Sequence, residues 1–82
     1  MKQIEWTGPS LEDMVALDKG IARRVKQAVE RFAESGAGSV KKLQGIDPPE
    51  YRLRVGDYRI RFEFDGETVR ILRVRNRREA YR

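Results

Sequence analysis

The apolar residues at the start of the chain follow first a strand pattern and then a helical one. Residues 2–6 are predicted to form a short strand with Ile4 and Trp6 on one side. A helix is predicted next, with Pro9 at its first position and with Ser10 followed by Asp13 in a pattern that resembles a capping box. The apolar positions of this helix are Leu11, Met14, Val15 and Leu17.

A second, longer helix is predicted to begin after Asp18, whose carboxylate can cap it. Its apolar residues recur at steps of three or four, so they form one stripe: Ile21, Val25, Ala28, Val29 and Phe32. The small residues at 35–39 end the helix. Residues 40–50 are expected to form an irregular connection, because Gly45 and Pro48-Pro49 oppose regular structure.

Beyond residue 50 the hydrophobic period changes from 3.6 to 2, which predicts half-buried strands. Arginines and acids alternate with the apolar residues Tyr51, Leu53, Val55, Tyr58, Ile60, Phe62 and Phe64. Gly56-Asp57 has the chemistry of a two-residue type II′ hairpin turn. Asp65-Gly66 gives a similar signal for a second hairpin, which leads to Val69, Ile71, Leu72 and Val74.

This order of elements predicts an α+β domain: an N-terminal strand, a two-helix hairpin, and then a three-stranded antiparallel meander, with the helices on one face of the sheet. A chain of 82 residues has room for a single domain, which we assign to residues 1–82.

A two-residue turn at Gly56-Asp57 also fixes the register of the strands beside it. The expected pairs are Val55 with Tyr58, Arg54 with Arg59, Leu53 with Ile60, and Arg52 with Arg61. Four arginines then share one sheet face, with directly opposed side chains about 5 Å apart at Cβ, where like charges destabilise the sheet. The arrangement indicates a face that holds a polyanion. The competing interpretation is a solvated face whose long side chains splay apart.

The last predicted strand does not keep a simple alternation. A two-residue Asp65-Gly66 turn would place Val69 and Ile71 on the helix side, but Arg73, Arg75 and Arg77 would then follow them inward. Either the turn is longer, or a bulge or a strand end near Val74 resets the alternation.

The charge is distributed unevenly along the chain. Residues 1–50 hold eight Lys/Arg and eight Asp/Glu, whereas residues 51–82 hold ten arginines, no lysine and five acids, so the net charge of +5 lies in the second segment. Arginine without lysine favours recognition of phosphate or carboxylate, because the planar guanidinium binds these anions through two parallel hydrogen bonds. An arginine-rich solvated surface is the plainer alternative.

Composition also removes several kinds of chemistry. Without cysteine or histidine, the chain has no disulfide, no thiolate nucleophile and no imidazole base, and we expect neither a metal nor a cofactor. No signal peptide or membrane span is evident, so we expect a cytoplasmic protein that does not bind membranes.

Two segments, read together, resemble the RelE/ParE toxin superfamily. They are Tyr51-Arg52-Leu53-Arg54-Val55-Gly56-Asp57-Tyr58-Arg59-Ile60 and Leu72-Arg73-Val74-Arg75-Asn76-Arg77-Arg78-Glu79-Ala80-Tyr81-Arg82. The shorter runs 18–25 and 42–45 also fit the superfamily, so the resemblance covers almost the whole chain.

The resemblance implies a RelE-like toxin of a type II toxin–antitoxin pair. Such a toxin is neutralised by its cognate antitoxin protein and cuts mRNA in the A site of the 30S ribosomal subunit, where the 2′-hydroxyl attacks the adjacent phosphate. It is thus an endoribonuclease, or mRNA interferase, that inhibits translation.

The superfamily's functional positions can be carried over one by one. Arg52 and Arg54 match two basic residues that are lysines in the best-studied pattern, and Arg59 matches the arginine after the turn. Arg77 matches the later arginine, and Tyr81 the terminal aromatic residue.

The resemblance therefore implies that Arg59 and Arg77 stabilise the charge that develops on the phosphorane. Arg52 and Arg54 hold the RNA backbone and raise the acidity of the 2′-hydroxyl, and Tyr81 stacks on or orients a base or accepts the proton. The expected phosphate-binding residues are Arg52, Arg54, Arg61 and Arg75.

Two departures from the pattern keep other activities open. Arginine in place of lysine at 52 and 54 is a poor general base, and Asn76 stands where many relatives carry histidine. The alternatives are a ParE-like inhibitor of DNA gyrase and a non-catalytic member that binds only its antitoxin.

Overall fold

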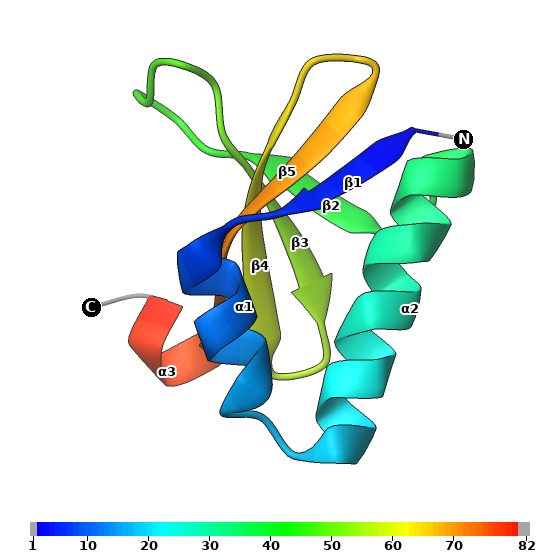
Figure 1. Ribbon diagram of the computed structural model, residues 1–82. Coiled ribbons are helices and arrows are strands. Elements are labelled where there is room, and N and C mark those ends of the chain that lie inside the picture. Colours follow the sequence, from blue (N-terminus) through cyan, green and yellow to red (C-terminus); the bar gives the residue numbers. More distant parts are fainter. Residues whose placement is uncertain (1, 81–82) are drawn as a thin grey trace.

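The computed structural model describes the backbone of residues 2–80 and the side chains of residues 2–78. Its centre is a five-stranded mixed sheet with the strand order β1-β5-β4-β3-β2 (Figure 1). Strand β1 runs parallel to β5, and the other neighbours are antiparallel. The strands are β1 (Gln3–Trp6), β2 (Ser39–Lys42), β3 (Tyr51–Val55), β4 (Tyr58–Phe64) and β5 (Thr68–Asn76).

The predicted α+β class and the β3–β4–β5 meander are confirmed, but the sheet is larger than predicted. The N-terminal strand joins it along β5, and β2 joins it along β3. The prediction of an irregular connection at 40–50 is therefore wrong for its first residues. Strand β2 has four residues, all of them exposed, so it has neither the length nor the alternation that reveals a strand in sequence.

Helix α1 (Gly8–Val15) is capped by Thr7 rather than by Ser10. The Thr7 hydroxyl accepts a hydrogen bond from the Ser10 backbone N–H, and the buried Ser10 hydroxyl donates to the Thr7 carbonyl. Thr7 Oγ1 also donates to the Ile71 carbonyl at 2.7 Å. The start of α1 is thus tied to the middle of β5.

Helix α2 (Lys19–Ser35) begins and ends where the sequence predicts. The Asp18 carboxylate accepts a hydrogen bond from the Gly20 N–H at 3.0 Å. At the other end, Gly36 takes a left-handed conformation with φ 76° and donates its N–H to the Phe32 carbonyl.

The apolar stripe of α2 packs on one face of the sheet and forms the core. Its buried residues are Val25, Val29, Phe32 and Ala33, and they meet Leu53, Ile60, Phe62, Val69, Ile71 and Val74. Met14 and Leu17, from α1 and the segment after it, pack against the same core. The opposite face of β3 and β4 carries the residues that alternate with these apolar ones.

The β3–β4 turn has the predicted register, with Val55 opposite Tyr58 and Arg54 opposite Arg59. Gly56 has φ 57°, which is the positive φ that a type II′ turn requires at its first central residue. Asp57, the second central residue, does not have a positive φ, as expected for this turn type.

Both possibilities left open for the last strand occur together. The second turn is longer than two residues, because Phe64 pairs with Val69. A register shift then places Arg61 opposite Arg73 and Phe62 opposite Ile71, so that Leu72 is the extra residue of a β-bulge. The bulge lets Ile71 and Val74 both face the core.

A short helix, α3 (Arg77–Ala80), follows β5 directly and lies against β5 and β4. None of the helices in the described part of the chain has the length and apolar character that a membrane span requires.

Candidate anion-binding face

The sheet face opposite the core carries six arginines in two cross-strand rows, and we call it the arginine face. The predicted set of Arg52, Arg54, Arg59 and Arg61 is confirmed to share this face, and the Leu72 bulge adds Arg73 and Arg75. One row runs across the sheet as Ser39, Arg54, Arg59 and Arg75, and the other as Lys41, Arg52, Arg61 and Arg73.

Arg59 is the most deeply buried charged group on the face, with 5% of its surface exposed. Its Nη1 donates to the Gly56 carbonyl at 2.9 Å and to the Tyr58 carbonyl at 3.1 Å. Within residues 2–78, no carboxylate forms an ion pair with it. Burying a cation without an anion is costly, so this position favours an external anion.

Arg75 is the cross-strand neighbour of Arg59. Its Nε is buried and has no hydrogen-bond partner within the described residues. Buried donors are rarely left unpaired unless a ligand or water completes them. Two cations therefore lie side by side here, and one of them, Arg75, has an N–H donor without a partner among the described residues.

Arg61 is held by a carboxylate of the same face. Its Nε and Nη2 both donate to Glu50 Oε1, at 3.0 and 2.6 Å. The Glu50 side chain is 14% exposed and that of Arg61 43% exposed. A phosphate that bound Arg61, as the sequence predicts, would therefore have to compete with the Glu50 carboxylate.

Arg73 is held in the same way by Asp13 of α1. Both Asp13 oxygens accept from the Arg73 guanidinium, at 2.9 and 3.1 Å, and Oδ2 also accepts from the Val74 N–H at 2.9 Å. Burial acts to raise the pKa of Asp13, but the bonds from Arg73 and Val74 outweigh it, so the net pKa lies below its ordinary value. Asp13 therefore stays ionised and fastens α1 to β5.

Arg70 lies farther along the face and is also matched by acids. Its guanidinium is 3.5 Å from Glu5 and 3.4 Å from Glu63, and its side chain is half exposed. It belongs to a mixed-charge surface beyond the two rows. Arginines at the margins of the face are thus paired with acids, whereas Arg59 and Arg75 are not.

Arg77 and Asn76 stand where β5 becomes α3. The Arg77 N–H donates to the Asp57 carbonyl at 2.6 Å, so α3 begins beside the turn that also holds Arg59. The Arg77 side chain is exposed. Asn76 Oδ1 accepts from the Arg78 N–H and so caps α3. The predicted Tyr81 lies outside the described residues.

Sequence reasoning missed three charged residues of the face. Lys41 joins through β2, which was not predicted, and Asp13 is 60 residues from Arg73 in sequence. Glu50 carried a readable signal, because it lies two positions before Arg52 and extends the same alternation.

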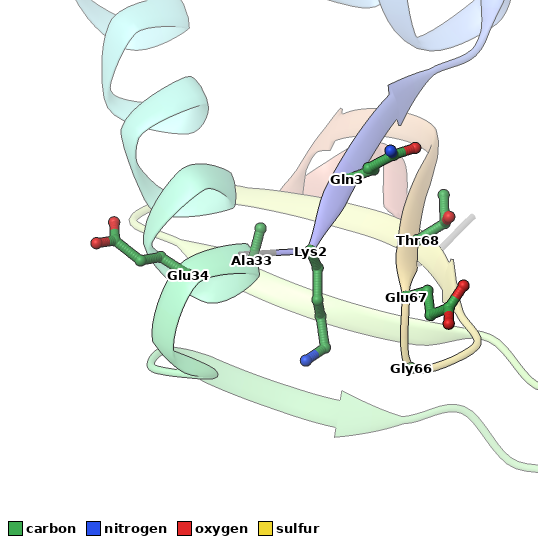
Figure 2. A pocket seen from close by; sticks show the side chains of 7 residues that line it. All are labelled: Lys2, Gln3, Ala33, Glu34, Gly66, Glu67 and Thr68. Carbon is green, nitrogen blue, oxygen red and sulfur yellow. The ribbon is translucent and has the colours of Figure 1, made fainter.

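None of three cavities in the described part of the chain is lined by an arginine of the two rows, although one of them includes Glu63 and Arg70 at the margin of the face. A cavity of about 470 Å³ lies where β1, the end of α2 and the β4–β5 turn meet. Figure 2 shows the side chains that line it. Its charged lining residues are Lys2, Glu34 and Glu67, so neither sign of charge prevails. No group of three or more acids able to hold a metal was found among the described residues. The arginine face is thus an open surface suited to a large ligand.

Comparisons with known proteins match nearly the whole chain. A family model described as "ParE toxin of type II toxin-antitoxin system, parDE" matches residues 4–81. Toxin RelE3 of Methanocaldococcus jannaschii is 32% identical over 76 residues, which cover 87% of this chain and 85% of that protein.

Solved toxin structures have the same fold. The RelB–RelE antitoxin–toxin complex of Methanococcus jannaschii has a TM-score of 0.77 at 28% identity and covers 94% of both chains. The RelBE2 toxin–antitoxin complex of Mycobacterium tuberculosis has a TM-score of 0.78 at 24% identity and covers 92% of this chain and 96% of that one.

Proposed function

We propose that this chain, which belongs to the RelE/ParE superfamily of type II toxin–antitoxin systems, is a toxin that cleaves mRNA on the ribosome. A cognate antitoxin would neutralise it. The observation that carries the nuclease proposal is the pair Arg59 and Arg75. One is buried without an acid partner, and the other has an unpaired buried Nε. A phosphodiester would supply the anion that both groups lack.

In the proposed reaction the arginines act mainly through electrostatics. The attack of the 2′-hydroxyl places extra negative charge on the phosphate oxygens, and Arg59 is already oriented by two backbone carbonyls before that charge appears. Arg77, beginning α3 beside the same turn, supplies a second cation. Arg52 and Arg54 bind the flanking RNA backbone, and Tyr81 stacks on a base.

An open face explains why the ribosome would be needed. None of three cavities formed by the described residues includes an arginine of the two rows, so these arginines lie on an open surface. Catalysis that depends on orientation then requires the ribosome to present the message. Free RNA would be cut weakly, and the toxin would act in the cytoplasm, where translation occurs.

The antitoxin is the second proposed partner. Two similar solved structures are toxin–antitoxin complexes. The surplus of +5 on this chain makes an acidic antitoxin segment the complementary partner.

A gyrase inhibitor is the second candidate, and the matching family model, whose description names the ParE toxin, favours it. This activity needs protein binding without RNA chemistry. A member that binds only its antitoxin is a third candidate, since the chain has no histidine to move a proton.

Controlled expression in a bacterial host separates these candidates. Truncated transcripts with blocked translation support the nuclease, DNA breaks with filamentation support the gyrase inhibitor, and normal growth supports the third candidate. For the nuclease, Arg59→Ala and Arg77→Ala should each abolish toxicity. The matched control is Arg70→Ala, which removes an arginine from the mixed-charge margin and should stay toxic. Full toxicity of both site variants, with folding intact, would refute the assignment.

A further inference from the structure

Cleavage by a 2′-hydroxyl needs a group that accepts its proton, and this inference about that group rests on the proposed nuclease function. Arginine and lysine cannot serve readily, because guanidinium and ammonium groups are protonated near neutral pH. The sequence has no histidine or cysteine. The acceptor among the described residues must therefore be a tyrosine or a carboxylate.

The two described tyrosines of the meander lie on the core side of the sheet. The Tyr51 ring stacks on Phe62 with centroids 5.6 Å apart, and Tyr58 packs against the core. Neither reaches the arginine face. The acid of the hairpin turn, Asp57, lines a cavity with Ile21 of α2 and so lies on the helix side.

Three acids, from α1, β1 and β4, lie along the arginine face, and their contacts rule them out as the base. Asp13 accepts bonds on both oxygens, and its lowered pKa makes it a weak base. Glu5 and Glu63 pair with Arg70, which lies one row beyond Arg61 and two rows beyond Arg59.

Glu50 remains. Oε1 is fixed by two bonds from Arg61, whereas Oε2 accepts none within the described residues. The backbone is fixed as well, because the Glu50 carbonyl accepts the Leu43 N–H at 2.9 Å. The side chain is thus oriented and retains one unused oxygen.

The position of Glu50 relative to the phosphate site also fits. Arg61, which holds it, follows Arg59 by two residues on the same face, a separation of about 7 Å along a strand. A phosphate on Arg59 would be about 3 Å from the attacking 2′-oxygen in a reactive geometry. One ribose can therefore lie between the two guanidinium groups, with its 2′-hydroxyl facing Glu50.

We propose that Glu50 is the general base of the reaction and that Oε2 takes the proton. As the 2′-oxygen–phosphorus bond forms, the hydroxyl proton moves to Oε2. The bond from phosphorus to the 5′-oxygen breaks, and the 5′-oxygen takes a proton from water. The products are a 2′,3′-cyclic phosphate and a 5′-hydroxyl, and Glu50 then returns its proton to solvent.

The test is single-turnover cleavage of ribosome-bound mRNA by Glu50→Gln. Glutamine keeps an oxygen that can accept from Arg61, but it cannot take a proton. We expect the rate constant to fall by about 10²-fold or more, with ribosome affinity and far-ultraviolet circular dichroism unchanged. The matched control is Glu63→Gln, which removes an acid from the next strand on the same face and should cleave within a few-fold of wild type.

A pH profile separates a base from a residue that only positions Arg61. The charged groups facing Glu50 are Arg61 and Glu63 on β4, Arg52 on β3 and Lys41 on β2. In Glu50→Gln hydroxide must replace the base, so the rate should rise about tenfold per pH unit between about pH 6.5 and 8.5. The wild-type and Arg61→Ala rates should be nearly level over this range, because both retain the carboxylate.

Each outcome is decisive. Cleavage by Glu50→Gln at the wild-type rate would exclude Glu50 as the base, and so would a slow rate with an unchanged pH profile. If Glu50→Gln fails to fold, the same question can be asked with Glu50→Ala, to which formate is added as a replacement carboxylate. Failure of formate to restore cleavage would overturn the proposal. In these cases the nuclease function still stands if Arg59→Ala is inactive. Absence of cleavage by wild-type protein would overturn both proposals.

Discussion

Asp13→Asn is expected to destabilise the protein, although the two side chains are nearly the same size. Asp13 accepts three hydrogen bonds that connect α1 to β5, two from Arg73 and one from the Val74 N–H. Asparagine has one oxygen acceptor, and its NH₂ group would face the Arg73 donors. The ion pair and at least one hydrogen bond are therefore lost.

The size of the effect follows from the exposure of the two partners. A hydrogen bond to a charged group contributes about 1.5–3 kcal/mol. The Asp13 side chain is 15% exposed, but that of Arg73 is 36% exposed, so solvent screens part of this. We expect a loss of about 1–2 kcal/mol, which lowers the melting temperature of a domain of this size by about 4–16 °C.

Urea denaturation of wild type and Asp13→Asn at several pH values measures the size of the stability loss and tests its electrostatic cause. The pKa of Asp13 in the folded state lies below its ordinary value of 3.8. Its stabilisation is therefore present above that value and is lost as pH falls through the lower, folded pKa. The difference in free energy of unfolding between wild type and Asp13→Asn should be largest at pH 7 and should shrink below about pH 4.

Glu12→Gln is the matched control, because Glu12 is the exposed neighbouring acid on the same helix. It should change stability by less than about 0.5 kcal/mol. A loss of unfolding free energy in Asp13→Asn that is equally large at pH 7 and pH 3 would refute the electrostatic explanation and point to altered packing.

Three further results are expected. Deletion of Leu72 removes only the extra residue of the bulge and leaves Ile71, Arg73 and Val74 in regular alternation opposite their present partners, so a thermal melt should remain cooperative. Gly38→Ala should cost about 1–3 kcal/mol in urea denaturation, because a Cβ there meets Leu53 Cδ1 at 2.9 Å and φ is 142°. Inorganic phosphate should shift the Arg75 Nε–H resonance in NMR spectra but not that of Arg70; the reverse would contradict the anion site.

The elements that the sequence predicts correctly are those with a strong local signal. The α2 stripe and its Asp18 cap, and the Gly56-Asp57 turn with its register, each depend on residues close together in the chain. Strand β2 gave no such signal, because its pairing with β3 depends on a partner supplied by the rest of the fold. The cap of α1 was misplaced because Pro9 and Ser10 looked like a helix start, whereas Thr7 also bonds to β5.

The candidate site was predictable in position but not in its internal pairing. The alternation of apolar and charged residues, together with the hairpin turn, predicted without any tertiary information that four arginines share one face: Arg52, Arg54, Arg59 and Arg61. The ion pair of Asp13 with Arg73 could not be foreseen, because it joins a helix to a strand brought together only by packing. Which arginines are already neutralised is thus a property of the fold.

The pattern of pairing gives the two rows of the arginine face different roles. In the row of Arg61 and Arg73, acids of the protein occupy the guanidinium groups, and a phosphate would have to displace them. In the row of Arg59 and Arg75, no acid of the described residues forms an ion pair, although the charge of Arg75 helps to lower the pKa of Asp13. Coulomb attraction for an incoming anion is strongest where a buried charge is unmatched. Under the proposed function, messenger RNA and an acidic antitoxin segment should therefore compete for this row, and binding of the antitoxin should prevent cleavage.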